Sequence, residues 1–114
     1  MDDDPVLTNP GLYSVVMENE RVRVLEYRDR PGDTTRPHGH PDSVMVTLSG
    51  FRRRLVDGER STEVELSPGL VRWLPAQRHS GENIGETDTH VLFVELKAQA
   101  PRETGEVPLG PIGA

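Results

Sequence analysis

Residues 32–50 read GDTTRPHGHPDSVMVTLSG, a polar loop that carries His38-Gly39-His40 and leads into an apolar run. Side chains two positions apart on an extended backbone point to the same side, so His38 and His40 can converge on one ion. Gly39 has no side chain to obstruct that approach. Neutral imidazole nitrogen binds zinc, iron, copper, nickel and manganese. The stretch therefore favours a metal site, although such a pair taken alone is more often a pair of surface histidines.

A third histidine lies in a second stretch, residues 69–83, which read GLVRWLPAQRHSGEN. His79 follows Pro75, which ends an expected strand, and an antiparallel barrel can bring it beside the first pair. The remaining histidine, His90, shares the face of an apolar strand with leucine and valine. That position indicates a packed or edge histidine rather than a further ligand.

Short apolar or alternating runs, separated by turn residues, make up most of the chain. It contains 11 glycines and 10 prolines, which indicates many turns. Asp57-Gly58 predicts a hairpin. No stretch keeps a helical period, so we expect no helix longer than about two turns. The strands that we expect are residues 12–17, 21–28, 43–49, 51–56, 61–66, 70–74 and 90–96. This spacing is typical of an all-β sandwich or a closed jelly roll.

The two histidine-bearing stretches resemble the two motifs of the cupin family. The residues that match those motifs are Gly32, His38, His40, Gly50, Gly69, Pro75, His79 and Asn83. The resemblance covers about residues 20–97. It implies a cupin-type double-stranded β-helix, which is a jelly-roll barrel, and one divalent transition metal ion bound by His38, His40 and His79. The expected divisions are a flexible N-terminus over 1–9, the barrel over 10–97 and an extended C-terminal tail over 98–114.

The chain departs from the family pattern at the fourth ligand. No glutamate follows His40 where the family has one, and Gln77 replaces a glycine of the second motif. Asp42 is the nearest carboxylate and a candidate additional ligand, but a role in the turn after the proline is the favoured interpretation. Glu82 is a second candidate, and its favoured roles are to orient His79 or to face solvent.

The alternation of side chains along a strand predicts which residues line the pocket. If Ser43 faces the metal, Met45 and Thr47 face the same way and line the pocket. Ordinary core packing is the favoured interpretation of Met45. The residues that remain open as contacts for a small acidic substrate are Tyr27, Arg36, Arg72 and Trp73.

Composition and charge narrow the classes of partner. The net charge is −6 and no basic patch dominates, so no nucleic-acid partner is expected. The run Arg52-Arg53-Arg54 is interpreted as solvated cations on a strand. The absence of cysteine excludes a disulfide framework and a thiol nucleophile. No apolar run approaches the roughly 20 residues of a membrane span, and no signal-peptide pattern opens the chain. A cytoplasmic protein without a membrane partner is expected.

The ligand set leads to the functional hypothesis. Three neutral ligands leave a divalent ion with its charge and with open positions, which suits Lewis-acid chemistry or, with Fe(II), the binding of O₂. We expect a metalloenzyme acting on a small organic metabolite, with dioxygenase-like oxidation leading and isomerase or lyase chemistry also open. The alternative is a non-catalytic metal-containing module that binds or senses a small molecule. Fe, Zn, Mn, Ni and Cu all remain candidate metals.

The resemblance carries two further expectations. Small cupins commonly dimerise, so a homodimer is expected. The chain also resembles a bacterial cupin subgroup that includes proteins named for β-alanine degradation. The stretches shared with that subgroup are His40-Pro41-Asp42, Trp73-Leu74-Pro75-Ala76, Glu82-Asn83-Ile84-Gly85 and Val94-Glu95-Leu96-Lys97.

Overall fold

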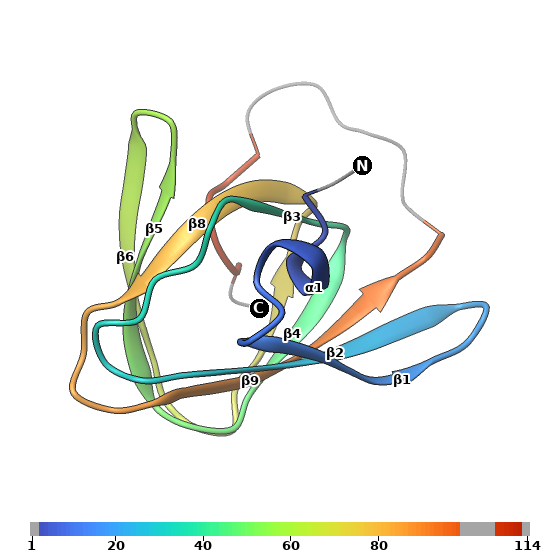
Figure 1. Ribbon diagram of the computed structural model, residues 1–114, viewed down its shortest axis with the longest axis horizontal. Coiled ribbons are helices and arrows are strands. Elements are labelled where there is room, and N and C mark those ends of the chain that lie inside the picture. Colours follow the sequence, from blue (N-terminus) through green and yellow to red (C-terminus); the bar gives the residue numbers. More distant parts are fainter. Residues whose placement is uncertain (1–2, 99–106, 113–114) are drawn as a thin grey trace.

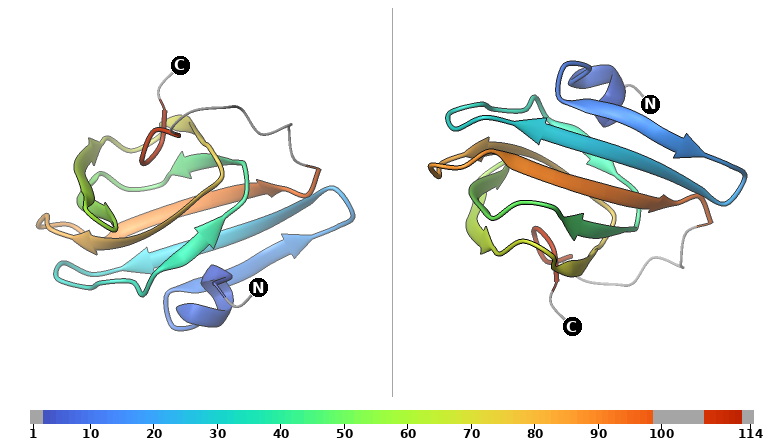
Figure 2. Two further views of the ribbon diagram at one scale, coloured as in Figure 1. Left: turned by 90° about the horizontal axis from the view of Figure 1, so that it is seen from above. Right: turned by 90° about the horizontal axis from the view of Figure 1, so that it is seen from below.

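The computed structural model describes residues 3–98 and 107–112 and has the shape of a barrel built from two antiparallel sheets (Figures 1 and 2). One sheet has the strand order β1-β2-β9-β4-β7 and the other has the order β3-β8-β5-β6. The elements are α1 (Pro5–Thr8), β1 (Tyr13–Glu18), β2 (Val22–Asp29), β3 (His38–His40), β4 (Ser43–Thr47), β5 (Phe51–Asp57), β6 (Arg60–Leu66), β7 (Val71–Leu74), β8 (Gln77–Asn83) and β9 (Thr89–Leu96). The predicted all-β jelly-roll barrel is confirmed.

Side chains alternate between the inside and the outside of the barrel along its strands. In β9, buried and half-buried positions alternate from Thr89 to the end of the strand. The apolar residues that form the core, each at most 7% exposed, are Tyr13, Leu25, Tyr27, Met45, Phe51, Leu74, Val91 and Phe93. Burial of each large apolar side chain contributes about 1.5–3 kcal/mol to folding. The core therefore occupies the space between the sheets, beside the site described below.

The predicted hairpin joins β5 to β6. Asp57 pairs with Arg60 across a loop of two residues, and Gly58 there has a φ of 61°. Glycine adopts this positive φ without a steric cost, so the residue fits the tight turn. The hairpin forms one edge of the four-stranded sheet and lies at the upper left of Figure 1.

Two strands were not predicted from the sequence, and both carry metal-ligand candidates. His38–His40 is itself a strand, β3, and it pairs with β8. His79 lies inside β8 rather than in a loop after a strand. The sequence of β8 contains no apolar residue, so its buried positions offered no hydrophobic alternation to detect.

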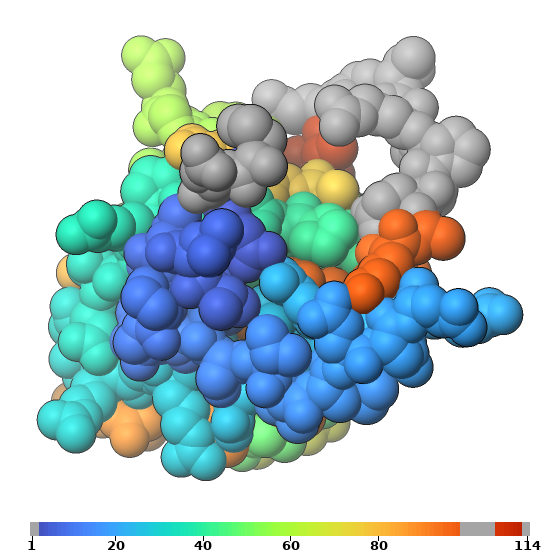
Figure 3. Space-filling model, turned by 45° about the vertical axis from the view of Figure 1, so that its right-hand side comes forward, coloured from blue at the N-terminus to red at the C-terminus, as the bar shows by residue number. Residues whose placement is uncertain are grey.

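The N-terminal segment packs against the strand that carries His38 and His40. Asp4 caps α1 by accepting a hydrogen bond from the Val6 amide at 2.9 Å. The Gly39 amide donates to the Asp3 carbonyl at 2.7 Å. Asn9 Oδ1 accepts from the Arg36 amide at 2.7 Å. This segment, dark blue in Figure 3, lies where a flexible N-terminus was predicted, and α1 contacts both β1 and β3.

The described part of the C-terminal tail, residues 107–112, returns to the barrel. Ile112 and Trp73 exchange two backbone hydrogen bonds, of 2.6 and 3.2 Å. The remainder of the predicted tail, residues 99–106 and 113–114, lies outside the described residues. Among the described residues, no helix is long and apolar enough to cross a membrane.

Candidate metal centre

Three histidine side chains meet inside the barrel. His38 and His79 are register partners on β3 and β8, and His40 follows two positions after His38 on the same face. The ring centroids are 4.8 Å apart for His38 and His40, 5.0 Å for His38 and His79, and 5.1 Å for His40 and His79. The sequence expectation that these three residues lie together matches their position in the structure.

The separation of the ring nitrogens fits a metal ion. One nitrogen from each ring can be chosen so that all three lie within 4.8 Å of one another. Two nitrogens that each lie about 2.1 Å from one tetrahedral ion are about 3.4 Å apart, so closure onto an ion shortens these separations by up to about 1.4 Å. Among the described residues, this is the only group of three or more histidine and acidic residues with such geometry.

Hydrogen bonds fix the orientation of two of the rings. His38 Nδ1 lies 2.7 Å from the Arg36 carbonyl oxygen, and His79 Nδ1 lies 2.8 Å from Gln77 Oε1. Because both oxygens can only accept, each Nδ1 carries the proton and each Nε2 presents a lone pair. The Tyr13 hydroxyl lies 3.3 Å from His38 Nε2 and can donate to this lone pair only while no metal ion is bound there, whereas the Arg36 carbonyl and Gln77 bond to the opposite nitrogens. Such second partners of a ligand histidine set its tautomer and direction.

His40 lacks hydrogen-bond partners. It is 4% exposed, and neither of its ring nitrogens has a hydrogen-bond partner in the described structure. Its Nδ1 lies 3.9 Å from Glu95 Oε2, which also lacks a hydrogen bond. An unsatisfied buried polar group costs about 1–3 kcal/mol. A metal ion at Nε2, with Nδ1–H turned toward Glu95, would satisfy both nitrogens, so the residues present fit the metal that the motifs imply.

Burial keeps all three imidazoles neutral. It lowers the pKa of His38 and lowers the pKa of His40 and His79 well below the ordinary value. The nearby Arg53 guanidinium lowers the pKa of His38 and His79 further, by a smaller amount. A neutral ring keeps the lone pair that a metal requires, so the cluster is ready to ligate at neutral pH.

The fourth-ligand candidate lies outside the cluster. Asp42 is not brought to the three histidines, and its Oδ1 accepts a hydrogen bond from the Ala76 amide at 2.8 Å. That bond ties the start of β4 to the turn between β7 and β8. This bond joins segments that are far apart in sequence, so it differs from the local turn after the proline that was the favoured interpretation of Asp42. Glu82 lies on the outer face of β8 and pairs with Arg54 at 3.5 Å.

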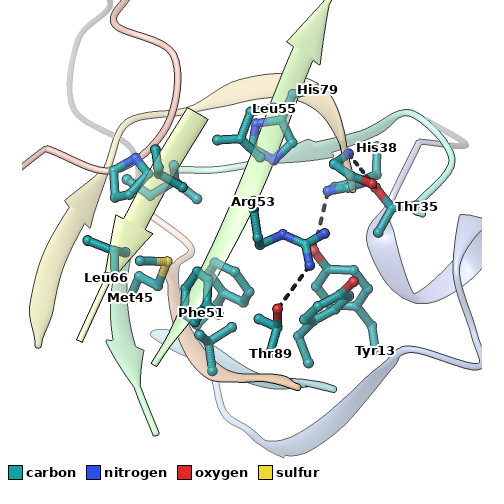
Figure 4. A pocket seen from close by; sticks show the side chains of 17 residues that line it. Tyr13, Thr35, His38, Met45, Phe51, Arg53, Leu55, Leu66, His79 and Thr89 are labelled. Atoms are coloured by element: carbon teal, nitrogen blue, oxygen red, sulfur yellow. Dashed lines mark hydrogen bonds between the residues drawn. The ribbon is translucent and has the colours of Figure 1, made fainter. Parts of the chain in front are cut away.

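A cavity of about 50 Å³ opens beside the histidines (Figure 4). Most of its wall is apolar, and its polar wall groups include His38, His79, Arg53, Tyr13, Tyr27 and Thr89. Of the predicted wall residues, Met45 lines the cavity. Ser43 and Thr47 are buried on the same face but are not among the wall residues. Thr47 instead accepts from the Leu70 amide at 2.8 Å.

Arg53 corrects the interpretation of the arginine run. Arg52 and Arg54 have side chains 52% and 42% exposed, whereas the Arg53 side chain is only 9% exposed and lies in the cavity wall. The alternation of Phe51, Arg53 and Leu55 on one face of β5 was the available signal. Of the four predicted substrate contacts, Tyr27 lines the cavity. Arg36, Arg72 and Trp73 are not among the described wall residues.

Gln77 connects His79 to the C-terminal segment. Its Oε1 accepts from His79 Nδ1 and also from the Gly110 amide at 2.8 Å. Its Nε2 donates to the carbonyl of Pro108 at 3.2 Å. The residue that departs from the family pattern therefore orients a ligand candidate and ties residues 107–112 to the barrel.

Comparison with known proteins identifies the family. No protein-family model and no curated protein matched the chain. Among solved structures, a cupin domain from Bordetella pertussis Tohama I is 31% identical, with 76% of this chain and 93% of that one covered and a TM-score of 0.71. The chain therefore belongs to the cupin family.

More distant structures share the fold. An RmlC-like cupin with a double-stranded β-helix fold from Methanocaldococcus jannaschii is 12% identical, with 75% of this chain and 78% of that one covered and a TM-score of 0.59. A predicted oxalate decarboxylase from Thermotoga maritima is 19% identical, with 74% and 78% covered and a TM-score of 0.52. At these identities the likeness describes the barrel and does not extend to the chemistry.

Proposed function

We propose that this cupin is a metal-dependent enzyme acting on a small organic metabolite, with oxidation by O₂ as the leading reaction. The observation that carries the proposal is the buried cluster of His38, His40 and His79 beside a largely apolar cavity. One divalent transition metal ion, held by these three residues, would supply Lewis acidity and, as Fe(II), a position for O₂. The family's glutamate ligand is missing, so the ligand set is neutral and the ion keeps its full charge.

The chain's own residues supply the environment that such chemistry needs. The Arg36 carbonyl and Gln77 orient two of the imidazoles. Burial raises the pKa of Tyr13 well above its ordinary value, so the phenol stays protonated and remains a hydrogen-bond donor beside His38. The largely apolar wall keeps bulk water away from the histidine cluster.

Two other functions use the same residues. Lyase chemistry would use the Lewis acidity of an ion on the same three histidines. A non-catalytic module for binding or sensing a small molecule is supported by the small size of the cavity, about 50 Å³. The test below separates turnover with O₂ from both.

Oxygen uptake provides the test. The metal-free protein is loaded anaerobically with Fe(II), mixed with small acids and thiols, and exposed to air in an oxygen electrode. We expect uptake that requires both a substrate and His79, so that His79→Ala abolishes it. His90→Ala, which changes a histidine outside the cluster, is the matched control and should retain uptake. Tight binding of a candidate without uptake would support the binding module, and conversion without uptake would support a lyase.

Three sequence-based expectations stay predictions: the β-alanine subgroup, a cytoplasmic location and a homodimer. The fold bears on the way a dimer could form, because β9 lies between β2 and β4 and offers no free edge to a partner. The edge strand β1, by contrast, exposes Val15, Val16 and Met17. Light scattering at micromolar concentration tests for the dimer, and a monomer would contradict it.

A further inference from the structure

The cavity contains one charged side chain among the described residues of its wall, that of Arg53. The strand β5 directs it inward together with Phe51 and Leu55. Figure 4 shows its guanidinium in the middle of the cavity, near the labelled His38 and Tyr13. A buried guanidinium is stable only when its charge and its N–H groups are matched by partners.

The face of this guanidinium lies over the Tyr27 ring, with Cζ 5.1 Å from the ring centroid, and only one end of it is matched by hydrogen bonds among the described residues. Nη1 donates to Asp29 Oδ2 and, at 3.1 Å, to Thr89 Oγ1. Among the described residues, no acceptor bonds to Nε or Nη2. An arginine has five N–H donors, so the edge formed by Nε and Nη2 remains available for a ligand.

Asp29 anchors the guanidinium without occupying that edge. Its Oδ2 also accepts from the Tyr27 hydroxyl, and its Oδ1 accepts from Asn83 Nδ2 at 3.0 Å and from the Thr89 amide at 3.3 Å. The carboxylate is therefore saturated with donors. Arg53 and Asp29 cancel in charge, and a divalent ion on three neutral imidazoles would leave excess positive charge for an anion to balance.

Gly81 provides the space for the free edge. A Cβ atom at position 81 would lie 2.8 Å from Arg53 Nη2 and 3.5 Å from Nε, so a larger residue would displace the guanidinium. Gly81 follows His79 by two positions and lies on the same face of β8. The available donors of Arg53 therefore lie beside the strand that carries a metal-ligand candidate.

We propose that the Nε–Nη2 edge of Arg53 binds the carboxylate of a small aliphatic acid, whose other end lies toward His38 and His79. This assignment rests on the proposed function and names its substrate class. A planar carboxylate matches the two parallel donors of one guanidinium edge. The cavity of about 50 Å³ limits the acid, because one water-sized group needs about 10–15 Å³. The acid is therefore about the size of acetate or glycolate.

The test uses the metal-free protein, so that it does not depend on the metal. The ¹⁵N–¹H resonance of Arg53 Nε is followed during titration with acetate and with glycolate. We expect a saturable shift with both acids and no shift with acetamide, the uncharged analogue of acetate. Arg53→Lys keeps the charge but loses the fork, and it should weaken binding by about tenfold or more, as expected for a lost charge-assisted hydrogen bond. Binding by Arg53→Lys is followed by calorimetry.

Two further variants keep the outcome interpretable if Arg53→Lys fails to fold. Gly81→Ala displaces the guanidinium without changing any charge and should also weaken acetate binding. Arg52→Lys alters the neighbouring arginine on the outer face of β5 and should leave it unchanged. Absence of a shift with either acid, or equal weakening by Arg52→Lys, would overturn the proposal. Sulfate binding as tightly as acetate would overturn the assignment to carboxylates. Metal content is measured separately, so failure of the anion site is distinguishable from failure of the metal site.

Discussion

Two buried ion pairs flank the histidine cluster, and they differ in what they leave unused. In the pair Arg53–Asp29, the carboxylate is saturated and the guanidinium keeps a free edge in the cavity. In the pair Arg23–Glu95, the guanidinium is engaged at 2.8 Å with Glu95 Oε1 and at 2.9 Å with Asp4. Glu95 Oε2 is left without a hydrogen bond, 3.9 Å from His40 Nδ1.

The difference shows that the other hydrogen-bond partners of an ion pair determine which donor or acceptor the pair leaves free for a neighbouring site. One pair presents a spare donor to the cavity and the other presents a spare acceptor to a metal-ligand candidate. Buried ion pairs add little net stability compared with apolar packing, because desolvation offsets their attraction. The groups left without partners are therefore better explained by binding than by folding. The predictions below test this difference, beginning with the cluster that lies between the two pairs.

Removing a ligand should have the largest effect. His79→Ala deletes one of three ligands and should lower metal affinity by more than about 100-fold, the upper end of the loss seen for outer partners of metal ligands. His90→Ala, outside the cluster, should bind metal as the unaltered protein does. Elemental analysis after dialysis measures both. Equal metal content in the two variants would show that the two ion pairs do not flank a metal site.

The next test compares how much Arg53 and Arg23 each contribute to the free energy of unfolding. Arg53→Met leaves Asp29 buried without its cation and should cost about 3–5 kcal/mol of unfolding free energy. Arg23→Met should cost about 1 kcal/mol, because Arg23 is 18% exposed and burial already raises the pKa of Glu95, so that Glu95 can take up a proton. Urea denaturation with constant m-values measures both. Similar costs would remove the contrast between the pairs.

Glu95 tests the acceptor side of the comparison. Glu95→Gln keeps the shape of the side chain but removes the charge that Nδ1–H of His40 would meet, so metal affinity should fall by about tenfold. Glu26→Gln, on the outer face of the same sheet, is the matched control and should leave affinity unchanged. Competition with a chromogenic chelator gives both values. Unchanged affinity in Glu95→Gln would make Glu95 a structural residue alone.

Acidification should destabilise the metal-free protein. Burial lowers the pKa of all three cluster histidines, so between their folded values and the ordinary value of about 6.5 the unfolded chain binds more protons. Their contribution to stability is present above about pH 6.5 and is lost as the pH falls below it. Glu95, whose pKa burial raises, acts in the opposite direction at lower pH. Urea midpoints from pH 8 to pH 5 should therefore fall, and a flat or rising profile would contradict the assignment.

Much of the fold could be predicted from the sequence because its signals are local. Glycines, prolines and alternating apolar residues define most of the strands, and Asp57-Gly58 defines the hairpin. The strands β3 and β8 could not be found in this way, because their inward residues are histidine, glycine and asparagine. These polar residues are buried because they serve the site, so hydrophobic periodicity is lost where function is concentrated.

Only part of the site could be predicted from the sequence. The spacing of His38 and His40 predicts their convergence, since it depends on strand geometry alone. The inward position of Arg53 follows from parity with Phe51 and Leu55, but a run of three arginines suggested a solvated face. The approach of Glu95 to His40 depends on pairing between β4 and β9, strands far apart in the sequence. Such long-range register is set by tertiary packing and is not written in a local pattern.

The central claim is that His38, His40 and His79 hold one metal ion, and direct localisation of the metal tests it. Protein produced without added metal is analysed for its elements, and its crystals are measured across the absorption edge of the metal found. The account predicts about one ion per chain, with an anomalous density peak about 2.0–2.2 Å from one nitrogen of each ring. Protein that retains no metal after supplementation, or a peak at other side chains, would contradict it.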